Sequence, residues 1–491
     1  MKRWSLALAT VLVLSVLAVS VVGAQGPTGQ DLPGGPWVTG TQIQNVGTGT
    51  ASIVMTVYGQ TSGDWSLTEN NVAPGASVNF LASSFGWPSG SMGSAVARSD
   101  QPIVAQTTET NGTAAAQYQG VDSPDVQVNF PLVKNNYKQS GKTTTFYVQN
   151  AGSTDEIIYA EYKDESGTTY NWNSGSAVGA GRMVVLNPAD VSFPQNQLGS
   201  LVVTCNVPIA GVVNEHHITD GEILQATRGF SPDEAGDTLL IPTIKKEFGF
   251  RSTGPIVQNA SSSPSDITIT YKGPGIDFVQ KAVGVPAGSS VTFYDNAEIC
   301  PAGATCSQTG TPLPVGTLAS AVVEGTQQIV AVSNETFRSI PAGQRQRQTV
   351  TSAFNQASAT KTVAVPLYKV NHDYKNTGCQ LQNTNLTTAA NYEATFSLGS
   401  GPVKTYVLKG TIPAGQAVTL YKLYASLPPG SSWQGTGFPP SFANYSTSTE
   451  RFGSITITAD QNIVAAITEA DEDPVSASRQ DIKSYEAFNL P

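Results

Sequence analysis

The chain has 491 residues, of which only 13% are charged, and its formal net charge is −10. Ser, Thr, Asn, Gln and Gly must therefore supply much of the surface, because the charged fraction is about half the usual value. The acidic balance argues against a nucleic-acid partner, since nucleic-acid-binding proteins carry basic stripes.

The N-terminus has the order of a secretory signal peptide. Lys2 and Arg3 precede an apolar run over residues 6–22, and small residues follow up to Ala24. This pattern predicts export and cleavage after Ala24. An uncleaved anchor helix is the alternative, although the run is short for a membrane span. No later stretch approaches spanning length, so we expect residues 25–491 to be secreted, with no integral membrane segment after signal cleavage.

Four blocks of sequence recur in the same order along the rest of the chain. A Gln-Asn pair, with Asn at positions 45, 150, 259 and 383, is followed by a Gly-containing turn and then by a strand of small residues. The last block reads "QPIVAQTTET", "VPIAGVVNEH", "QQIVAVSNET" and "QNIVAAITEA" in successive copies. Four ordered blocks repeated four times indicate a tandem array.

Each copy has the pattern of a β-sandwich. Apolar and polar residues alternate, Val, Ile, Thr and Tyr are frequent, and turns separate the runs. About seven short strands in roughly 110 residues is typical of an immunoglobulin-like sandwich, although the Cys…Trp…Cys framework is missing. We predict an all-β tandem array of four immunoglobulin-like β-sandwich domains after a cleaved signal peptide. The predicted boundaries are 1–24 for the signal peptide and 25–121, 122–232, 233–357 and 358–491 for the four domains.

The sequence Gly141-Lys142-Thr143 looks like the end of a nucleotide-binding phosphate loop. That loop also needs Gly where Asn136 stands and a helix after the lysine. Residues 143–148 are β-branched and aromatic, so we predict a strand there and reject a nucleotide site. The Asn of each Gln-Asn pair lies where a strand meets a turn. We expect its amide to bond the nearby backbone; a shared ligand site is the alternative.

The segments between copies contain proline, which predicts stiff connections and a semi-rigid rod. The chain ends in "SYEAFNLP", residues 484–491, which matches the start of another junction, while the N-terminal side is Gly-Pro-rich where other copies have a basic-aromatic strand. These ends could pair between molecules by strand addition. The alternative, which we prefer, is a normal last strand within the fourth unit.

The stretches "FPLVKNNY", "YVQNAGSTDEIIYAEYKD" and "KEFGFRSTGPIVQNASSSPSDITITYKGPG" resemble a tandem repeat of secreted proteins from Chloroflexota and related filamentous bacteria. The resemblance covers nearly all of the mature chain. It implies β-sandwich units and an extracellular or cell-surface location. The function of that family is uncharacterised, so it implies no site residues. The first unit departs from the pattern because it lacks the full Pro-Leu-Val strand.

The four cysteines fall into two classes. Cys300 and Cys306 enclose a short Pro- and Gly-containing loop in an exported chain, which predicts a disulfide. Cys205 and Cys379 lie in strand-like runs far apart, and we expect buried free thiols. An interchain bridge between them is the alternative.

Few residues suggest catalysis. The segment at residues 214–222 gathers His216 and His217 with acidic residues, but adjacent histidines in a strand point to opposite faces, which disfavours shared coordination of zinc. No Gly-x-Ser-x-Gly motif occurs, and no acidic pair recurs at a fixed position, as a glycosidase would suggest. We predict no catalytic residue, cofactor or metal site. The protein is not expected to be an enzyme.

Trp87 and Trp433 lie in comparable loops before the small-residue strand. Packing under a long loop is one explanation, and a platform for stacking sugars is the other. We therefore predict a secreted structural protein of a bacterial cell surface, sheath, S-layer or extracellular filament that self-associates. The alternative is an adhesin or carbohydrate-binding protein that binds polysaccharide through these exposed aromatics.

Overall fold

The computed structural model describes residues 32–138, 141–294, 297–337, 347–399, 403–472 and 482–490. The predicted signal peptide and its cleavage site lie outside these ranges. The described part is all-β, as predicted: it contains strands and short 3-10 turns but no α-helix. No helix in this part is long and apolar enough to cross a membrane.

The strands fall into four successive units with the same order. The first unit contains β1 (Val38–Asn45), β2 (Ala51–Gly59), β3 (Asp64–Val72), β4 (Ser77–Leu81), β5 (Gly93–Ser99), β6 (Ile103–Thr110) and β7 (Ala115–Gln119). The second contains β8 (Asp125–Lys134), β9 (Lys142–Asn150), β10 (Tyr159–Asp164), β11 (Thr169–Asn173), β12 (Met183–Leu186), β13 (Leu198–His217) and β14 (Leu224–Arg228).

The third and fourth units keep this order and add short strands. The third contains β15 (Gly236–Lys246), β16 (Arg251–Asn259), β17 (Ser265–Lys272), β18 (Val279–Val285), β19 (Ser290–Tyr294), β20 (Ala297–Ile299), β21 (Thr305–Thr309), β22 (Thr317–Phe337), β23 (Gln348–Ser352) and β24 (Phe354–Asn355). The fourth contains β25 (Thr360–Lys369), β26 (Lys375–Asn383), β27 (Ala390–Leu398), β28 (Lys404–Ile412), β29 (Ala417–Leu420), β30 (Ser432–Gln434), β31 (Phe452–Asp471), β32 (Ile482–Glu486) and β33 (Phe488–Leu490).

Each unit is sandwich-like, with antiparallel pairing throughout. In the first unit, β4-β1-β6-β7 and β3-β2-β5 form two separate sheets. In the other units one long strand takes the places of both β5 and β6. The first half of β13, for example, pairs with β8 and β10, and its second half pairs with β9 and β14. Alternate residues of these strands point inward, so each unit has its own apolar core.

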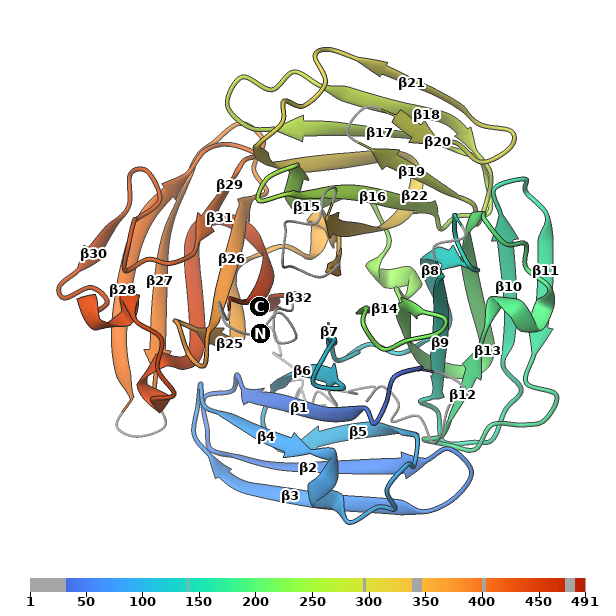
Figure 1. The fold of residues 1–491 in the computed structure, drawn as a ribbon, viewed down its shortest axis with the longest axis horizontal. Coiled ribbons are helices and arrows are strands. Elements are labelled where there is room, and N and C mark those ends of the chain that lie inside the picture. The colour runs from blue at the N-terminus through green and yellow to red at the C-terminus, as the bar shows by residue number, and fades with distance from the viewer. Residues whose placement is uncertain are drawn as a thin grey trace, which may run out of the picture.

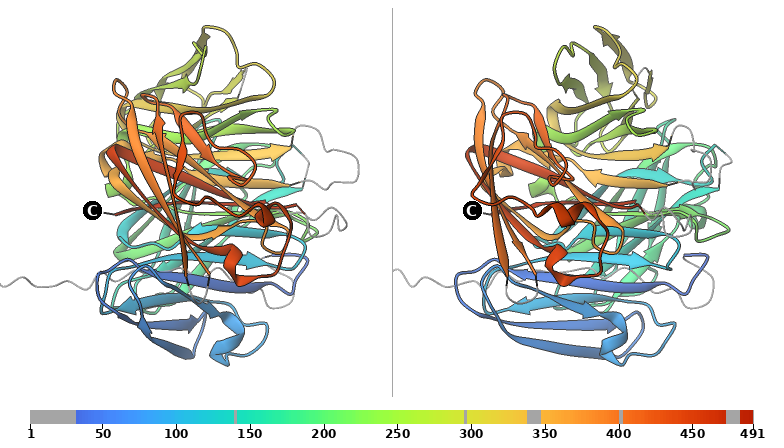
Figure 2. Two further views of the ribbon diagram at one scale, coloured as in Figure 1. Left: turned by 90° about the vertical axis from the view of Figure 1, so that its left-hand side faces the viewer. Right: turned by 60° about the vertical axis from the view of Figure 1, so that its left-hand side comes forward.

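The four units close into a ring around their innermost strands (Figure 1). The strands β7, β14, β23 and β32 contact one another in a cycle, which returns from the fourth unit to the first. Gln42 Nε2 donates to the carbonyl of Pro366 at 3.3 Å across this closing junction. Figure 2 shows the units gathered around a centre, with the first unit (blue) next to the fourth (red). The predicted rod is therefore wrong: the junctions turn the chain, and Pro131, Pro242 and Pro366 lie inside the strands β8, β15 and β25 instead of stiffening a linker.

One hydrogen bond is repeated at all four junctions between units. A serine of each small-residue strand donates to a turn carbonyl of the next unit, and the last unit donates to the first: Ser94 to Gly181 (2.5 Å), Ser200 to Gly288 (2.5 Å), Ser320 to Gly415 (3.3 Å) and Ser454 to Gly75 (3.5 Å). The Gln of each Gln-Asn pair donates to the same carbonyl from within its unit: Gln44, Gln149, Gln258 and Gln382, at 2.9–3.2 Å. The recurring blocks thus specify the ring junction as well as the unit.

The Asn of each pair has the structural role that its position predicted. Asn45 Nδ2 donates to the carbonyls of Gly49 and Val72, and its Oδ1 accepts from the amide of Gly47. The same bonds recur in the other units at Asn150, Asn259 and Asn383. These amides are fully buried and satisfy turn backbone, so they are not a shared ligand site.

The C-terminal segment is an ordinary part of the fourth unit. β32 pairs with β31, and β33 pairs with β25. Tyr485 is 1% exposed, and its hydroxyl donates to the carbonyl of Leu367 at 2.9 Å. The preferred prediction, a normal last strand, is confirmed. β32 and β33 are thus each paired along one edge and most of their apolar side chains are buried, which opposes strand addition between molecules through this segment.

The described part of the first unit lacks the first strand that the other three units have. In the other units a strand ending in Lys (β8, β15 or β25) pairs beside the small-residue strand, whereas the described part of the first unit has no such partner for β5. Leu32 and Trp37 instead pack against alanines and Tyr118 near the ring centre. Trp37 is 1% exposed and its indole donates to the carbonyl of Leu32 at 3.1 Å, so this segment is a buried part of that cluster.

Candidate anion-binding site

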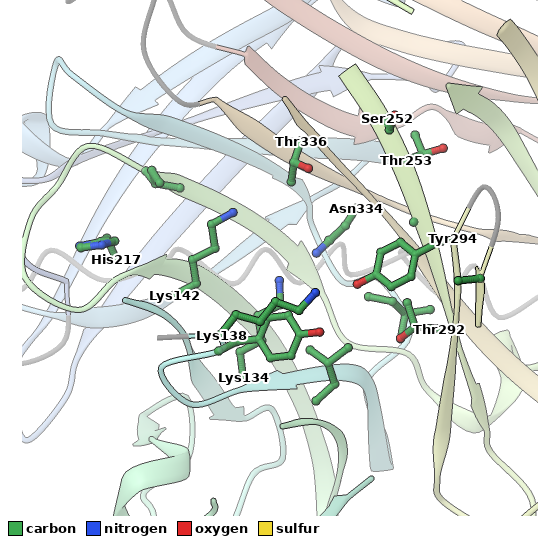
Figure 3. A pocket seen from close by; sticks show the side chains of 16 residues that line it. Lys134, Lys138, Lys142, His217, Ser252, Thr253, Thr292, Tyr294, Asn334 and Thr336 are labelled. Atoms are coloured by element: carbon green, nitrogen blue, oxygen red, sulfur yellow. The ribbon is translucent and has the colours of Figure 1, made fainter. Parts of the chain in front are cut away.

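A cavity of about 680 Å³ lies between the second and third units. The second unit contributes the end of β8, the hairpin that follows it and the end of β13, with Lys134, Lys138, Lys142 and His217. The third unit contributes hydroxyl and amide side chains from β16, β19 and β22: Ser252, Thr253, Thr292, Tyr294, Asn334 and Thr336. Figure 3 shows the lysines on one side of the cavity and Tyr294 on the other.

The hairpin between β8 and β9 brings three lysines to one end of the unit. Asn136 and Lys138 adopt left-handed backbone, with φ of 46° and 53°, and Asn136 Oδ1 accepts from the amide of Gly141 at 3.0 Å. Gly141 has φ of 73°, and a Cβ there would lie 2.3 Å from the His217 ring. The chain therefore reverses tightly here, which places Lys142 at the start of a strand. The rejection of a nucleotide loop is confirmed.

The lining is strongly cationic. No Asp or Glu is among the described residues that line the cavity, although the whole chain is acidic. Lys134 is engaged in a buried ion pair with Glu215, with 2.6 Å between Nζ and Oε2. Burial opposes ionisation of Glu215, but Lys134 and Lys142 outweigh it and hold the pKa of this carboxyl below its usual range. The charge of Lys134 is thus neutralised by Glu215.

The other two lysines are available to a ligand. Within the part of the chain that the structure describes, neither Lys138 nor Lys142 makes an ion pair, and burial is the main cause that lowers the pKa of Lys142. Lys134 and Lys142 share the single carboxylate of Glu215, so this cluster keeps a net positive charge, which favours an incoming anion. Lys138 Nζ lies 5.2 Å from the centre of the Tyr137 ring, which anchors its stem beside the cavity.

The two adjacent histidines point apart, as predicted. His217 lines the cavity, and its Nδ1 lies 2.9 Å from Asp220 Oδ2. His216 is 5% exposed, with burial lowering its pKa, and its Nε2 contacts the Thr145 hydroxyl at 3.0 Å. Among the described residues, no group of three or more His, Cys, Asp or Glu side chains is placed to hold a metal ion.

Sequence reasoning missed a glutamate that recurs in all four units. The ninth position of the block beginning "QPIVAQTTET" is Glu in every copy, and each is at most 4% exposed: Glu109, Glu215, Glu335 and Glu469. The lysine that follows the junction proline neutralises three of them, through the pairs Lys134–Glu215, Lys245–Glu335 and Lys369–Glu469 at 2.6–2.7 Å. When the four repeats are aligned, the glutamate and the lysine each occupy a fixed position. Only a search for oppositely charged positions that recur together would have found this pair.

Glu109 is the exception, because the described part of the first unit, from residue 32 on, lacks the strand that would bring the lysine. Its Oε2 accepts from Asn214 Nδ2 of the second unit at 2.8 Å. Burial raises the pKa of Glu109 to about 7, although Asn214 and Tyr118 lower it. At neutral pH a substantial fraction of Glu109 is therefore protonated, whereas the other units have an ion pair at this position.

The predicted sugar-stacking role of Trp87 and Trp433 is not supported by their surroundings. Trp87 is 9% exposed and packs edge-on against Trp65, with 6.1 Å between the ring centres. Trp433 packs on Phe396 and Phe438, with ring centres at 5.9 and 4.8 Å. Trp433 lies in β30, an edge strand that pairs with β28, and Trp87 also lines a cavity between the first and fourth units. Packing accounts for much of both indole surfaces, and sugar stacking stays a prediction.

The cysteine predictions are confirmed. Cys300 and Cys306 form a disulfide with 6.2 Å between their Cα atoms. Cys205 and Cys379 are buried free thiols, and burial raises the pKa of Cys379 to about 12. Both cores therefore use a thiol as a small apolar group.

Comparisons with known proteins give little further guidance. No protein-family model and no curated protein match this chain. The chain is similar to a solved Thermotoga maritima protein, 1070, at 14% identity over 22% of this chain and 95% of that one, with a TM-score of 0.19. It is also similar to a tetra-tandem repeat in the extending region of a large adhesion protein, at 10% identity over 97% of this chain and 100% of that one, with a TM-score of 0.10. These scores are too low to bear on fold or function.

Proposed function

We propose that the protein is a secreted, non-catalytic bacterial cell-surface protein that binds an anionic ligand between its second and third domains. Its four units are interpreted as immunoglobulin-like β-sandwich domains. The observation that carries the binding role is the cationic cavity, in which neither Lys138 nor Lys142 makes a direct ion pair among the described residues. The secreted location is supported by the N-terminal sequence and by the disulfide, because disulfides persist outside the cytoplasm.

The cavity favours a carboxylated or phosphorylated ligand with several hydroxyl groups. Two ammonium groups would hold the anion by charge-assisted hydrogen bonds. The opposite wall presents Thr292, Tyr294 and Thr336, which can bond hydroxyls, and the volume suits a molecule of one or two sugar rings. An acidic saccharide or an organic polyacid fits this combination.

Binding should be measured by isothermal titration calorimetry of residues 25–491 with digalacturonate, citrate and inorganic phosphate. The test variant is Lys138→Ala combined with Lys142→Met, and the control is Lys409→Met, a half-exposed lysine on the outer hairpin of the fourth unit. We expect each cavity lysine to contribute about tenfold in affinity, and binding to weaken with salt. Unchanged affinity in the double variant, or no binding of any of the three anions, would overturn the proposal.

A structural role with self-association, the prediction from sequence, is the second candidate. The repeated serine bonds favour it, because a ring whose every junction is hydrogen-bonded is a rigid building block. We place the assembly contacts on the outer strands of the ring, because the C-terminal strands already pair with β31 and β25. Negative-stain electron microscopy tests this candidate: ordered sheets or filaments support it, and dispersed rings at high concentration oppose it.

A further inference from the structure

A second groove, of about 570 Å³, lies on the same seam between the second and third units. One wall is the outward face of the sheet formed by β8, β10, β11 and the first half of β13. The other wall is two turns of the third unit, at residues 259–262 and 287–288. Asn129 of β8 lines this groove and Lys134 lines the cationic cavity, so the two sites lie about 17 Å apart along the strand.

The groove contains an exposed aromatic ring on a flat sheet surface. Tyr159 is 48% exposed, whereas its neighbour in β10, Ala160, points into the core. Tyr159 stands directly opposite Asn173, and Glu161 stands opposite Asn171, in the pairing of β10 with β11. Tyr159 therefore presents an apolar ring with a polar hydroxyl on the groove wall, a combination that suits stacking against a sugar ring.

Amide side chains line the groove, although Asn129 is 1% exposed and bonds Gln127 and the carbonyl of Phe230. Asn171 and Asn173 from β11 lie on one side of the tyrosine ring, and Gln127 and Asn129 from β8 line the groove as well. Amides both donate and accept hydrogen bonds, which matches hydroxyl groups that do the same. The side chain of Asn171 makes no hydrogen bond within the part of the chain that the structure describes, so it is available to a ligand.

The charges of the groove are already used within the protein. Lys163 Nζ lies 3.5 Å from Glu161 Oε1 and donates to the carbonyl of Ala287 at 2.9 Å. The same turn is held by Gly288, whose carbonyl accepts from Ser200 and Gln258 at 2.5 and 3.1 Å. These bonds hold the groove wall in place, and its positive and negative charges balance. The cationic cavity at the other end of the seam instead has a net positive charge.

From these observations we propose that this groove binds a neutral saccharide chain. The C–H face of a sugar ring stacks on Tyr159, and the sugar hydroxyls bond Asn171, Asn173 and Gln127. The turn of the third unit closes one side and fixes the direction of the chain. The site does not depend on the anion-binding proposal, because it uses a different set of side chains and no free charge.

Affinity electrophoresis in gels containing dextran, laminarin or mannan, with polygalacturonate as the anionic comparison, tests this inference. The variants are Tyr159→Ala, Tyr159→Phe and Asn171→Ala, each checked for an unchanged melting temperature. Tyr445→Ala is the control, since Tyr445 is a partly exposed tyrosine of the fourth unit. We expect at least one neutral polysaccharide to retard the protein. Tyr159→Ala should weaken this retardation about tenfold, while Tyr159→Phe, which keeps the ring, retains most of it.

Three outcomes would overturn the inference: no retardation by any neutral polysaccharide, retardation that Tyr159→Ala leaves unchanged, and retardation by polygalacturonate alone. The last outcome would leave the cationic cavity as the only binding site. The Lys138→Ala, Lys142→Met variant separates the two proposals, because it should lose anion binding and keep retardation by the neutral polysaccharide.

Discussion

Replacing Glu109 with Gln should stabilise the protein, and more strongly as the pH rises. The folded protein binds the Glu109 proton more tightly than the unfolded chain does, because burial raises the pKa from 4.5 to about 7. Glu109 therefore lowers the stability once the pH rises above its pKa in the unfolded chain, and the loss grows until the pH exceeds its pKa in the folded protein. Glutamine keeps the shape and can still accept from Asn214 but never has to be deprotonated.

The size of the effect follows from the shift. A difference of about 2.5 pKa units corresponds to about 3 kcal/mol at pH 8, and to about 1 kcal/mol at pH 5. With an unfolding entropy of about 2.1 cal/mol/K per residue, cooperative unfolding of the whole ring would convert 3 kcal/mol into about 3 °C of melting temperature. Other buried carboxyls also titrate, so the informative quantity is the difference between variant and wild type at each pH.

Glu215→Gln is the matched control, because Glu215 occupies the same position of the next unit but is paired with Lys134. Removing one partner of a buried pair leaves an uncompensated charge, and we expect a loss of about 3–5 kcal/mol at neutral pH. Differential scanning calorimetry between pH 5 and 8 measures both variants. If Glu109→Gln lowers the melting temperature at pH 8 as Glu215→Gln does, the assignment of a protonated, cation-free Glu109 is wrong.

Three further predictions concern the ring and its covalent link. Small-angle X-ray scattering of residues 25–491 should give a radius of gyration of about 23 Å for a compact ring, whereas a value near twice that would restore the linear rod. Gly181→Ala should destabilise the junction of the first two units by about 1–3 kcal/mol more than Gly175→Ala in thermal melts. Both glycines have positive φ, but only a Cβ at Gly181 would meet the Tyr58 ring, at 2.7 Å. Equal losses would mean that backbone strain alone matters. Cys300→Ser with Cys306→Ser should cost about 2 kcal/mol, as expected for so short a loop, and no change in melting temperature would show that the bridge leaves the unfolded chain unconstrained.

Sequence patterns of short range were sufficient for much of the fold. Alternating residues identified the strands, and the repeated blocks located four cores, because each core is built within one unit. The disulfide was predictable from Cys300 and Cys306 since six residues separate them. The role of Asn45 and its equivalents also followed from local chemistry, because each bonds the turn beside it.

Short-range sequence patterns could not locate the candidate sites. The cationic cavity joins the hairpin at Lys138 and Lys142 to Tyr294 of the next unit, and nothing in either segment alone indicates the other. Tyr159 was missed for the same reason, since its groove is completed by a turn more than a hundred residues away. The surroundings of the tryptophans were also beyond the sequence, which reveals that a segment contains an aromatic residue but not how its ring packs.

By itself, then, the sequence determined an all-β chain of four repeated units, the Cys300–Cys306 bridge and the absence of a nucleotide loop. These properties depend on local periodicity and on residues close together in the chain. Only the tertiary structure decided that the units form a ring instead of a rod, that Ser454 of the last unit bonds Gly75 of the first, and that two pockets open on the seam between the second and third units. The direction in which a junction turns is set by packing between whole units, and no short stretch of sequence encodes that packing.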